Sequence, residues 1–377
     1  MDLKEDFQYS YSSYKETQLE GRYITLDVIE PLLQDLKNDF NVDVIGHSVL
    51  GKAIHKISIG NGPKKILMWS QMHGNESTTT KAVFDLLNFI KQNKSFGDFV
   101  KEHFTLSIIP MLNPDGATAY TRVNKNEVDL NRDAQNLSQP ESRVLNKEFK
   151  QFQPDFCFNL HDQRTIFSAG KHKKPATVSF LTPAEDKERK VTANRKKSME
   201  VIVKLNEMLQ TFIPNQVGRY DDGFNLNCVG DTFQSAGVPT LLFESGHFPN
   251  DYKREETRRL IAFSLVEALV FIGNTEITGD KYETYFKIPE NEKLYYDIIL
   301  RKFPFKNKDK VDTKDVAVFY KETLINGKVE FKPTVEHVEA HLHYFGHKEL
   351  DMSVIDVDSV EIHDLNTAYL TELLKKI

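Results

Sequence analysis

The 377-residue chain has little cysteine and no excess of basic charge. Its two cysteines are too few for a disulfide scaffold or for a zinc site built from cysteine alone. The 49 basic and 55 acidic side chains give a net charge of −6. Proteins that bind nucleic-acid backbones usually carry a strong basic excess. These absences argue against a disulfide-rich protein and against a nucleic-acid-binding protein.

Long apolar runs are also missing. The longest, at 260–272, has 13 residues including one glutamate. A helix that crosses a bilayer needs about 20 apolar residues, so we expect a buried helix here and no membrane partner. The first 18 residues are polar and acidic and lack the apolar segment of a secretory signal. We therefore expect a cytoplasmic protein.

Between about residues 20 and 275, short apolar runs alternate with helical patterns. This alternation predicts an α/β fold with a twisted, mixed or parallel sheet flanked by helices. In such sheets, functional side chains collect at the carboxyl ends of the strands. Ser138 and Glu141 have the spacing of a capping box that would open a helix at 141–152. The other expected elements are strands at 64–72, 103–112, 155–161, 176–182 and 238–245, and helices at 77–94, 184–212 and 257–272.

The pattern changes after Gly273. Short segments with period-two alternation, rich in Val, Tyr and Phe, predict a small β-rich C-terminal domain closed by a helix. We place the boundary between domains 1–275 and 276–377. If residues 337–347 lay on one strand, four histidines would share a face and could bind a second metal: His337, His341, His343 and His347. A solvated polar face is the alternative, because neither cysteines nor carboxylates support such a site.

Possible metal ligands follow two of the predicted strands. His73 and Glu76 come directly after the first strand, and His161 ends the third. Catalytic zinc usually has three protein ligands, and imidazole and carboxylate groups suit it. The three side chains therefore form a possible zinc site. Helix capping is the alternative role of Glu76.

Charged side chains follow the other strands. Glu244 comes after the apolar run 238–243, where a carboxylate is unfavourable unless it has a partner or a function. Arg122, Asn131 and Arg132 lie on loops at the same predicted sheet edge. Such a set can bind a carboxylate, because arginine offers a planar fork of donors and asparagine adds another. The alternative is that these arginines pair with nearby aspartates on the surface.

In this order, the motifs resemble the zinc-dependent metallocarboxypeptidase family, which is related to the aspartoacylase and succinylglutamate desuccinylase branch. The resemblance covers about residues 40–272 and rests on HGNE (73–76), NPDG (113–116), Arg122, DLNR (129–132), His161 and Glu244. It implies a twisted mixed sheet with flanking helices. It also implies one Zn²⁺ per chain, bound by His73, Glu76 and His161.

The resemblance also assigns roles to the remaining residues. It implies that Glu244 is the general base and that Arg122 stabilises the oxyanion. Asn131 and Arg132 would bind the free carboxylate of the substrate. Tyr220 is the nearest match to a mobile tyrosine of the family, and an ordinary loop tyrosine is the alternative.

The implied activity is removal of the C-terminal residue from a peptide or peptide-like substrate by metal-activated water. Asp115 and Gly116, which follow Asn113-Pro114, favour this peptidase activity. One alternative is a zinc deacylase of N-acyl amino acids, because the related branch shares HGNE and the DLNR motif. Asn131 and Arg132 of that motif form what we call the carboxylate clamp. Another alternative is a metal-free binding protein on the same fold, which the complete set of ligands disfavours.

Three further residues lie near the motifs. Cys157 and Cys228 fit buried apolar packing better than catalysis. His247, three residues after Glu244, fits a loop histidine better than a supporting group of the site.

Overall fold

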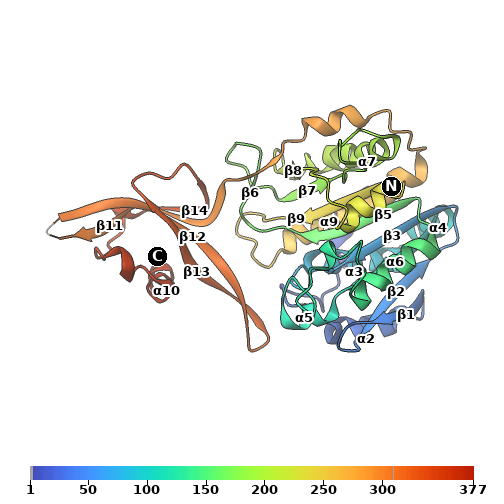
Figure 1. The fold of residues 1–377 in the computed structure, drawn as a ribbon, viewed down its shortest axis with the longest axis horizontal. Coiled ribbons are helices and arrows are strands. Elements are labelled where there is room, and N and C mark those ends of the chain that lie inside the picture. Colours follow the sequence, from blue (N-terminus) through green and yellow to red (C-terminus); the bar gives the residue numbers. More distant parts are fainter. Residues whose placement is uncertain (1–2, 309) are drawn as a thin grey trace. The chain divides into compact units, whose positions relative to one another are not determined.

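The computed structural model describes residues 3–308 and 310–377. Its largest element is an eight-stranded sheet with the order β1-β2-β4-β3-β5-β9-β7-β8 (Figure 1). Strands β4, β3, β5 and β9 are parallel, whereas β1, β2 and β7 join by antiparallel pairing. The sequence prediction of a mixed sheet is confirmed. The strands are β1 (Asn41–His47), β2 (Ala53–Ile59), β3 (Lys64–Ser70), β4 (Phe104–Ile109), β5 (Phe156–Asp162), β7 (Val178–Leu181), β8 (Val217–Arg219) and β9 (Thr240–Ser245).

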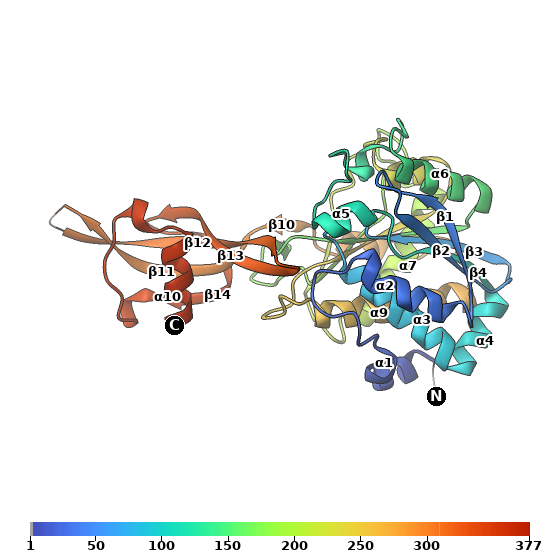
Figure 2. The ribbon, with the colours of Figure 1, turned by 90° about the horizontal axis from the view of Figure 1, so that it is seen from below.

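Helices cover both faces of this sheet. The central strands read as continuous apolar runs because parallel strands are buried on both sides. In Figure 2, α6 (Pro140–Phe152) lies on the opposite side of the sheet from α3 (Thr78–Gln92) and α9 (Glu255–Asn274). Helix α8 (Val229–Ser235) shares an apolar cluster with α6. The larger cluster, with α3 and α9, also includes α1 (Leu3–Tyr14), α2 (Leu26–Leu36), α4 (Lys94–His103) and α7 (Ala193–Leu209).

Two helix starts differ from the sequence prediction. Helix α6 begins at Pro140, and the expected capping box is absent, because Ser138 donates to Asp133 instead. Glu141 accepts a hydrogen bond from the amide of Val49, so its carboxylate holds a distant loop. Helix α7 begins at Ala193 rather than near 184, because the Thr192 hydroxyl accepts from the Arg195 amide and caps the helix there.

The contacts divide the chain into two units. The first contains the residues up to Gln163 together with Ala176–Asn291, and the second contains Arg164–Pro175 and Glu292–Ile377. The chain beyond α9 therefore stays in the first unit through η2 (Tyr282–Lys287). There the Tyr285 hydroxyl accepts a hydrogen bond from the Thr182 amide.

The second unit is β-rich and ends in a helix, as the sequence predicts. Its sheet has the order β13-β12-β11-β14, and α10 (Thr367–Lys376) packs in its apolar cluster. The segment Arg164–Pro175 contacts this sheet: Arg164 lies over the Phe319 ring at 4.6 Å, and the Ile166 carbonyl accepts from the Tyr295 amide. The strands are β6 (Phe167–Ala169), β10 (Asn291–Lys293), β11 (Tyr295–Asn307), β12 (Lys310–Ile325), β13 (Lys328–Glu339) and β14 (Phe345–Asp351).

The four C-terminal histidines do not share one strand face, so that expectation is wrong. Strand β13 ends at Glu339, which leaves His341 and His343 in the connection to β14. His337 lies on β13 and stacks on Tyr344, with ring centroids 5.8 Å apart. His347 lies on β14, where its Nε2 is 2.7 Å from the Thr165 carbonyl.

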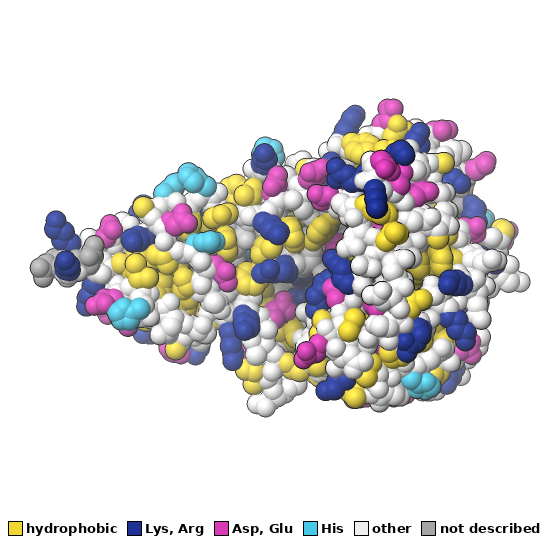
Figure 3. Space-filling model, viewed as in Figure 1, with side chains coloured by type: hydrophobic (Ala, Val, Ile, Leu, Met, Phe, Trp, Pro, Cys, Tyr) yellow, Lys and Arg dark blue, Asp and Glu magenta, His cyan; other side chains and the backbone are white. Residues whose placement is uncertain are grey.

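Basic and acidic side chains are interspersed over the face shown in Figure 3, in keeping with the modest net charge. None of the helices within the described ranges is both long enough and apolar enough to cross a bilayer.

Candidate metal centre and catalytic site

Three side chains meet where β3 and β5 end. His73 and Glu76 lie in the turn between β3 and α3, and His161 lies near the end of β5. One nitrogen or oxygen atom of each lies within 4.8 Å of the others. The Glu76 carboxylate oxygens are 2.8 Å from His73 Nδ1 and 2.9 Å from His161 Nδ1. The structure therefore brings together the three metal ligands that the sequence suggests, and all three are buried.

Further contacts hold the three side chains in place. Asp129 Oδ1 is 3.0 Å from His73 Nε2, and the Asp162 amide donates to Glu76 Oε2 at 3.1 Å. A carboxylate on the far nitrogen of a metal-binding histidine fixes the ring orientation and the tautomer. Asp129 belongs to the DLNR motif, but the sequence alone did not predict its contact with His73. An acidic residue on a loop at the same sheet edge was the available signal.

These contacts keep the Glu76 carboxylate ionised. Burial alone would raise its pKa, but His73 and His161 hold that pKa well below its usual range. The same kind of contact acts on His73: burial lowers its pKa, whereas Glu76 and Asp129 raise it above the ordinary value. The charges of His73, Glu76 and Asp129 therefore stabilise one another.

Glu244 lies beside this cluster on β9, where it pairs with His161 of β5. Its Oε2 is buried and has no hydrogen-bond partner in the described part of the chain. Burial raises the pKa of Glu244 well above its usual range, and the carboxylates of Glu76 and Asp162 raise it further. A carboxyl group with one buried, unpartnered oxygen and a strongly raised pKa is typical of a functional residue.

Arg122 and Tyr220 also lie close to these carboxylates. Arg122 Nη1 is 3.3 Å from Glu76 Oε1, and its Nε donates to Asp129 at 3.0 Å. The Arg122 side chain is 47% exposed, so it also faces solvent. Tyr220 follows β8 and is half-buried. Burial raises the pKa of its phenol, and the carboxylates of Glu244 and Glu76 raise that pKa further.

Asn131 and Arg132 lie on the short helix η1 (Leu130–Arg132). Asp129 caps this helix by accepting from the Asn131 amide at 2.9 Å. Asn131 Oδ1 accepts from the Val229 amide at 3.0 Å, which ties the loop to the start of α8. The Arg132 guanidinium is exposed and touches the Asn131 carbonyl at 2.7 Å. The two side chains thus lie next to each other on the loop that also positions Asp129.

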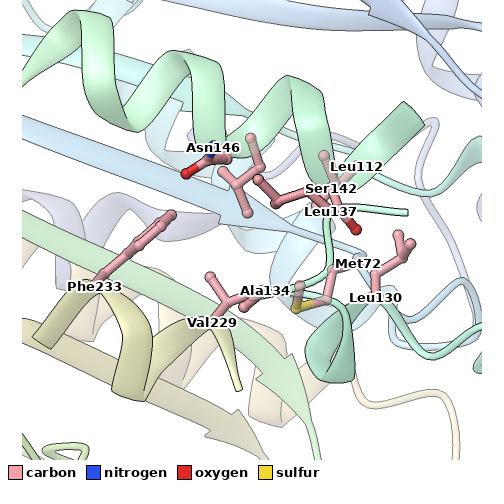
Figure 4. Close-up of a pocket in the computed structure, with 10 residues that line it drawn as sticks. Met72, Leu112, Leu130, Ala134, Leu137, Ser142, Asn146, Val229 and Phe233 are labelled. Carbon is pink, nitrogen blue, oxygen red and sulfur yellow. The ribbon is translucent and has the colours of Figure 1, made fainter. Parts of the chain in front are cut away.

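A small apolar pocket lies behind this loop (Figure 4). The metal-binding candidates do not line it, and its mostly apolar lining favours packing over catalysis. It separates the loop and α8 from α6. Its lining is Met72, Leu112, Leu130, Ala134, Leu137, Ser142, Leu145, Asn146, Val229 and Phe233.

Other candidates from the sequence stay outside the cluster. Cys157 is buried, and burial raises the pKa of its thiol. Cys228 precedes α8, and burial raises its thiol pKa to about 11. His247 is buried, with its ring 4.7 Å from that of Tyr252. Across residues 3–308 and 310–377, only His73, Glu76 and His161 form a group of three or more possible metal ligands, so a second site on the C-terminal histidines is not supported.

Comparison with known proteins identifies related sequences. A family model described as zinc carboxypeptidase matches residues 26–211, a range that includes the metal cluster but ends before Tyr220 and Glu244. Carboxypeptidase SOL1 of Arabidopsis thaliana is 30% identical over 151 residues, which cover 34% of this chain and 31% of the relative. Gamma-D-glutamyl-L-diamino acid endopeptidase 1 of Lysinibacillus sphaericus is 38% identical over 81 residues, or 19% and 20% of the two chains. The chain thus matches less than a third of each relative.

Solved structures show the same fold. A metallo-carboxypeptidase from Burkholderia cenocepacia aligns with a TM-score of 0.52 at 18% identity, covering 64% of this chain and 66% of the other. Carboxypeptidase A from Helicoverpa armigera aligns with a TM-score of 0.52 at 16% identity, covering 71% and 80%. The predicted carboxypeptidase-like fold is confirmed. Over residues 26–211, the chain is similar to the zinc carboxypeptidase family, as the sequence motifs suggest.

Proposed function

We propose that this chain is a zinc-dependent carboxypeptidase that hydrolyses the bond before the C-terminal residue of a peptide or peptide-like substrate. One observation carries the proposal: His73, Glu76 and His161 converge within 4.8 Å beside Glu244, whose Oε2 is buried and has no hydrogen-bond partner among the described residues. This combination provides both a metal site and a general base.

The donor set fits zinc. Two imidazole nitrogens and one carboxylate are a common ligand set of catalytic zinc, which keeps one coordination position for water or substrate. Asp129 supports His73 from its far nitrogen, as such sites usually require. One Zn²⁺ per chain would supply Lewis acidity, polarising the substrate carbonyl and lowering the pKa of water.

The protein groups would carry the proton transfer and the charge stabilisation. Glu244 accepts a proton from the attacking water and donates it to the leaving amine. Its surroundings, which raise its pKa, suit a group that must hold that proton between the two steps. Arg122 donates hydrogen bonds to the developing oxyanion, and loss of one such donor typically costs about 3–4 kcal/mol.

Asn131 and Arg132 would bind the free carboxylate of the substrate. A guanidinium and an amide together offer charge-assisted hydrogen bonds in a fixed geometry. The loop that carries them also carries Asp129, which contacts both His73 and the Asn131 amide. The position of the carboxylate clamp therefore depends on the same residue that orients His73. We assign Tyr220 to substrate binding from the family resemblance, and the effect of the Glu244 and Glu76 carboxylates on the pKa of its phenol supports this assignment.

Metal analysis and one isosteric substitution test the proposal. We expect purified protein to contain or take up about one zinc per chain. Glu244→Gln should keep the metal and lose hydrolysis, because the amide cannot accept the proton from water. Protein with less than about half an equivalent of zinc that regains none on soaking would contradict the zinc-site assignment. Full activity of Glu244→Gln would contradict the assignment of the general base.

A substrate panel tests the reaction class. It should compare peptides that have a free C-terminus with the same peptides amidated, and with N-acetyl and N-succinyl amino acids. We expect turnover of the free-carboxylate peptides alone. Fast turnover of acyl amino acids without peptide hydrolysis would instead show a deacylase. A gamma-D-glutamyl-diamino acid peptide belongs in the panel, because a relative named for that substrate matches part of this chain.

A further inference from the structure

Asn159 is a fully buried side chain that lies close to the metal cluster. Neither its Nδ2 nor its Oδ1 has a hydrogen-bond partner within residues 3–308 and 310–377. A buried amide left without partners is costly, and nearly all such groups in folded proteins are satisfied by protein or water. The proposed function given above does not use this residue.

The position of Asn159 relative to the catalytic groups follows from strand geometry. Asn159 and His161 alternate onto the same face of β5, about 6.6 Å apart along the strand. Asn159 pairs with Leu242 of β9, and His161 pairs with Glu244. The Asn159 amide therefore lies on the same sheet face as the metal cluster and the proposed general base. It is two residues nearer to the start of β5 than His161.

The other side of the amide is formed by α8. A Cβ atom added to Gly230 would lie 3.7 Å from Asn159 Nδ2. The preceding residue, Val229, donates its amide to Asn131, which belongs to the proposed carboxylate clamp. Figure 4 shows Val229 and Leu130 facing the same small pocket beside this junction. Asn159 thus lies between the metal cluster and the segment that is tied to the clamp.

A second unpaired donor lies next to Asn159. Trp69 pairs with Asn159 across β3 and β5, and both side chains project to the same sheet face. Trp69 Nε1 is also buried and without a hydrogen-bond partner in the described part of the chain. Two neighbouring polar groups in an otherwise apolar layer indicate a place where a polar group is bound.

We propose that Asn159 determines specificity by hydrogen-bonding the side chain of the residue that is released. This inference rests on the proposed function: with the scissile bond at the metal cluster and the carboxylate at Asn131 and Arg132, that side chain would extend toward Asn159. An amide offers both a donor and an acceptor, so it pairs with uncharged side chains that also have both. Substrates ending in asparagine or glutamine are therefore preferred over leucine or methionine of similar size.

The test compares matched substrates and a nearly isosteric variant. We expect kcat/KM of the wild-type enzyme to be at least about 100-fold higher for a blocked dipeptide ending in asparagine than for one ending in leucine, because a site built for hydrogen bonds rejects analogues that lack them. Asn159→Leu should remove or reverse this ratio while retaining zinc and hydrolysing the leucine substrate. Cys157→Ala, on the same face two residues further from the cluster, is the control and should keep the wild-type ratio.

The wild-type enzyme provides a second measurement that does not depend on a folded variant. Free L-asparagine should inhibit as a product more strongly than L-leucine. Equal kcat/KM values for the two wild-type substrates, or an unchanged ratio in Asn159→Leu, would overturn the inference and indicate that an internal water satisfies the amide. Peptide hydrolysis would still stand in that case. Absence of hydrolysis for every peptide by zinc-loaded protein would overturn the proposed function and this inference with it.

Discussion

Two histidines of the first unit and two of the second differ in burial and in the groups that they contact. In the first unit, His73 and His161 are buried and both contact Glu76. In the second unit, His341 and His343 are exposed, and their rings meet edge to face with centroids 4.9 Å apart. The second unit has the denser histidine cluster in sequence, yet the first brings three possible metal ligands within 4.8 Å of one another. Position at the carboxyl end of a buried strand is therefore more informative than the number of histidines in a segment.

Removing histidines from each unit should give the largest change in zinc content and hydrolysis. His161→Ala should lose most of the bound zinc and nearly all hydrolysis, because two ligands cannot maintain a catalytic zinc site. The matched control is His341→Ala combined with His343→Ala, which should retain zinc content and kcat/KM. Zinc loss in the control but not in His161→Ala would place the zinc site in the second unit instead of the first.

Arg122→Ala should lower kcat by about 10²–10³-fold, the typical effect of removing one donor to the oxyanion. The zinc content should stay near one equivalent, because Arg122 contacts Glu76 but is not a ligand in our assignment. Arg301→Ala in the second unit is the matched control for loss of an arginine, and kcat should be unaffected. Steady-state kinetics with metal analysis separate these results; an unchanged kcat in Arg122→Ala would refute its role.

Asp129→Asn should weaken zinc binding by about 10–100-fold, the usual effect of losing a carboxylate that supports a metal-binding histidine. Competition with a chelator measures this affinity. Asp315→Asn is a comparable change in the second unit, where the carboxylate bonds Arg301 at 2.9 Å, and zinc affinity should not change. Equal zinc affinity of Asp129→Asn and the wild type would show that Asp129 does not support the site.

One buried ion pair of the first unit and one exposed ion pair of the second extend the comparison, with a smaller expected effect. Arg258 and Asp85 are both fully buried, with Nη2 and Oδ1 2.6 Å apart. Arg258→Met should cost about 3–5 kcal/mol in the free energy of unfolding, because Asp85 would remain buried without its charge partner. Lys302 and Asp351 form an exposed pair, and Lys302→Met should cost only about 0–1 kcal/mol. Denaturant unfolding measures both; similar losses would contradict this distinction.

Much of the candidate site could be predicted from sequence because its residues follow strands. Apolar runs predict strands, and the carboxyl ends of parallel strands share one edge, so His73 and His161 were expected to meet. The resemblance to a family added the expected roles of Arg122 and Glu244. The sequence could not indicate that Asn159 lacks partners, because that depends on α8, which lies about 70 residues further along the chain.

Long-range packing also explains where the fold differed from expectation. Ser138 and Glu141 have capping-box spacing, but their side chains bond Asp133 and Val49, which local periodicity does not take into account. The segment Arg164–Pro175 begins three residues after His161, yet its contacts place it with the C-terminal sheet. The proximity of Asp129 to His73 likewise depends on a loop that returns to the sheet edge.

Zinc titration of three proteins tests whether the zinc site lies where β3 and β5 end: the wild type, His161→Ala, and the double variant with His341→Ala and His343→Ala. We predict that the wild type and the double variant bind about one zinc per chain with similar affinity, whereas His161→Ala does not. A wild type that binds no zinc, or a His161→Ala variant that binds zinc as tightly as the wild type, would show that His73, Glu76 and His161 do not form a zinc site.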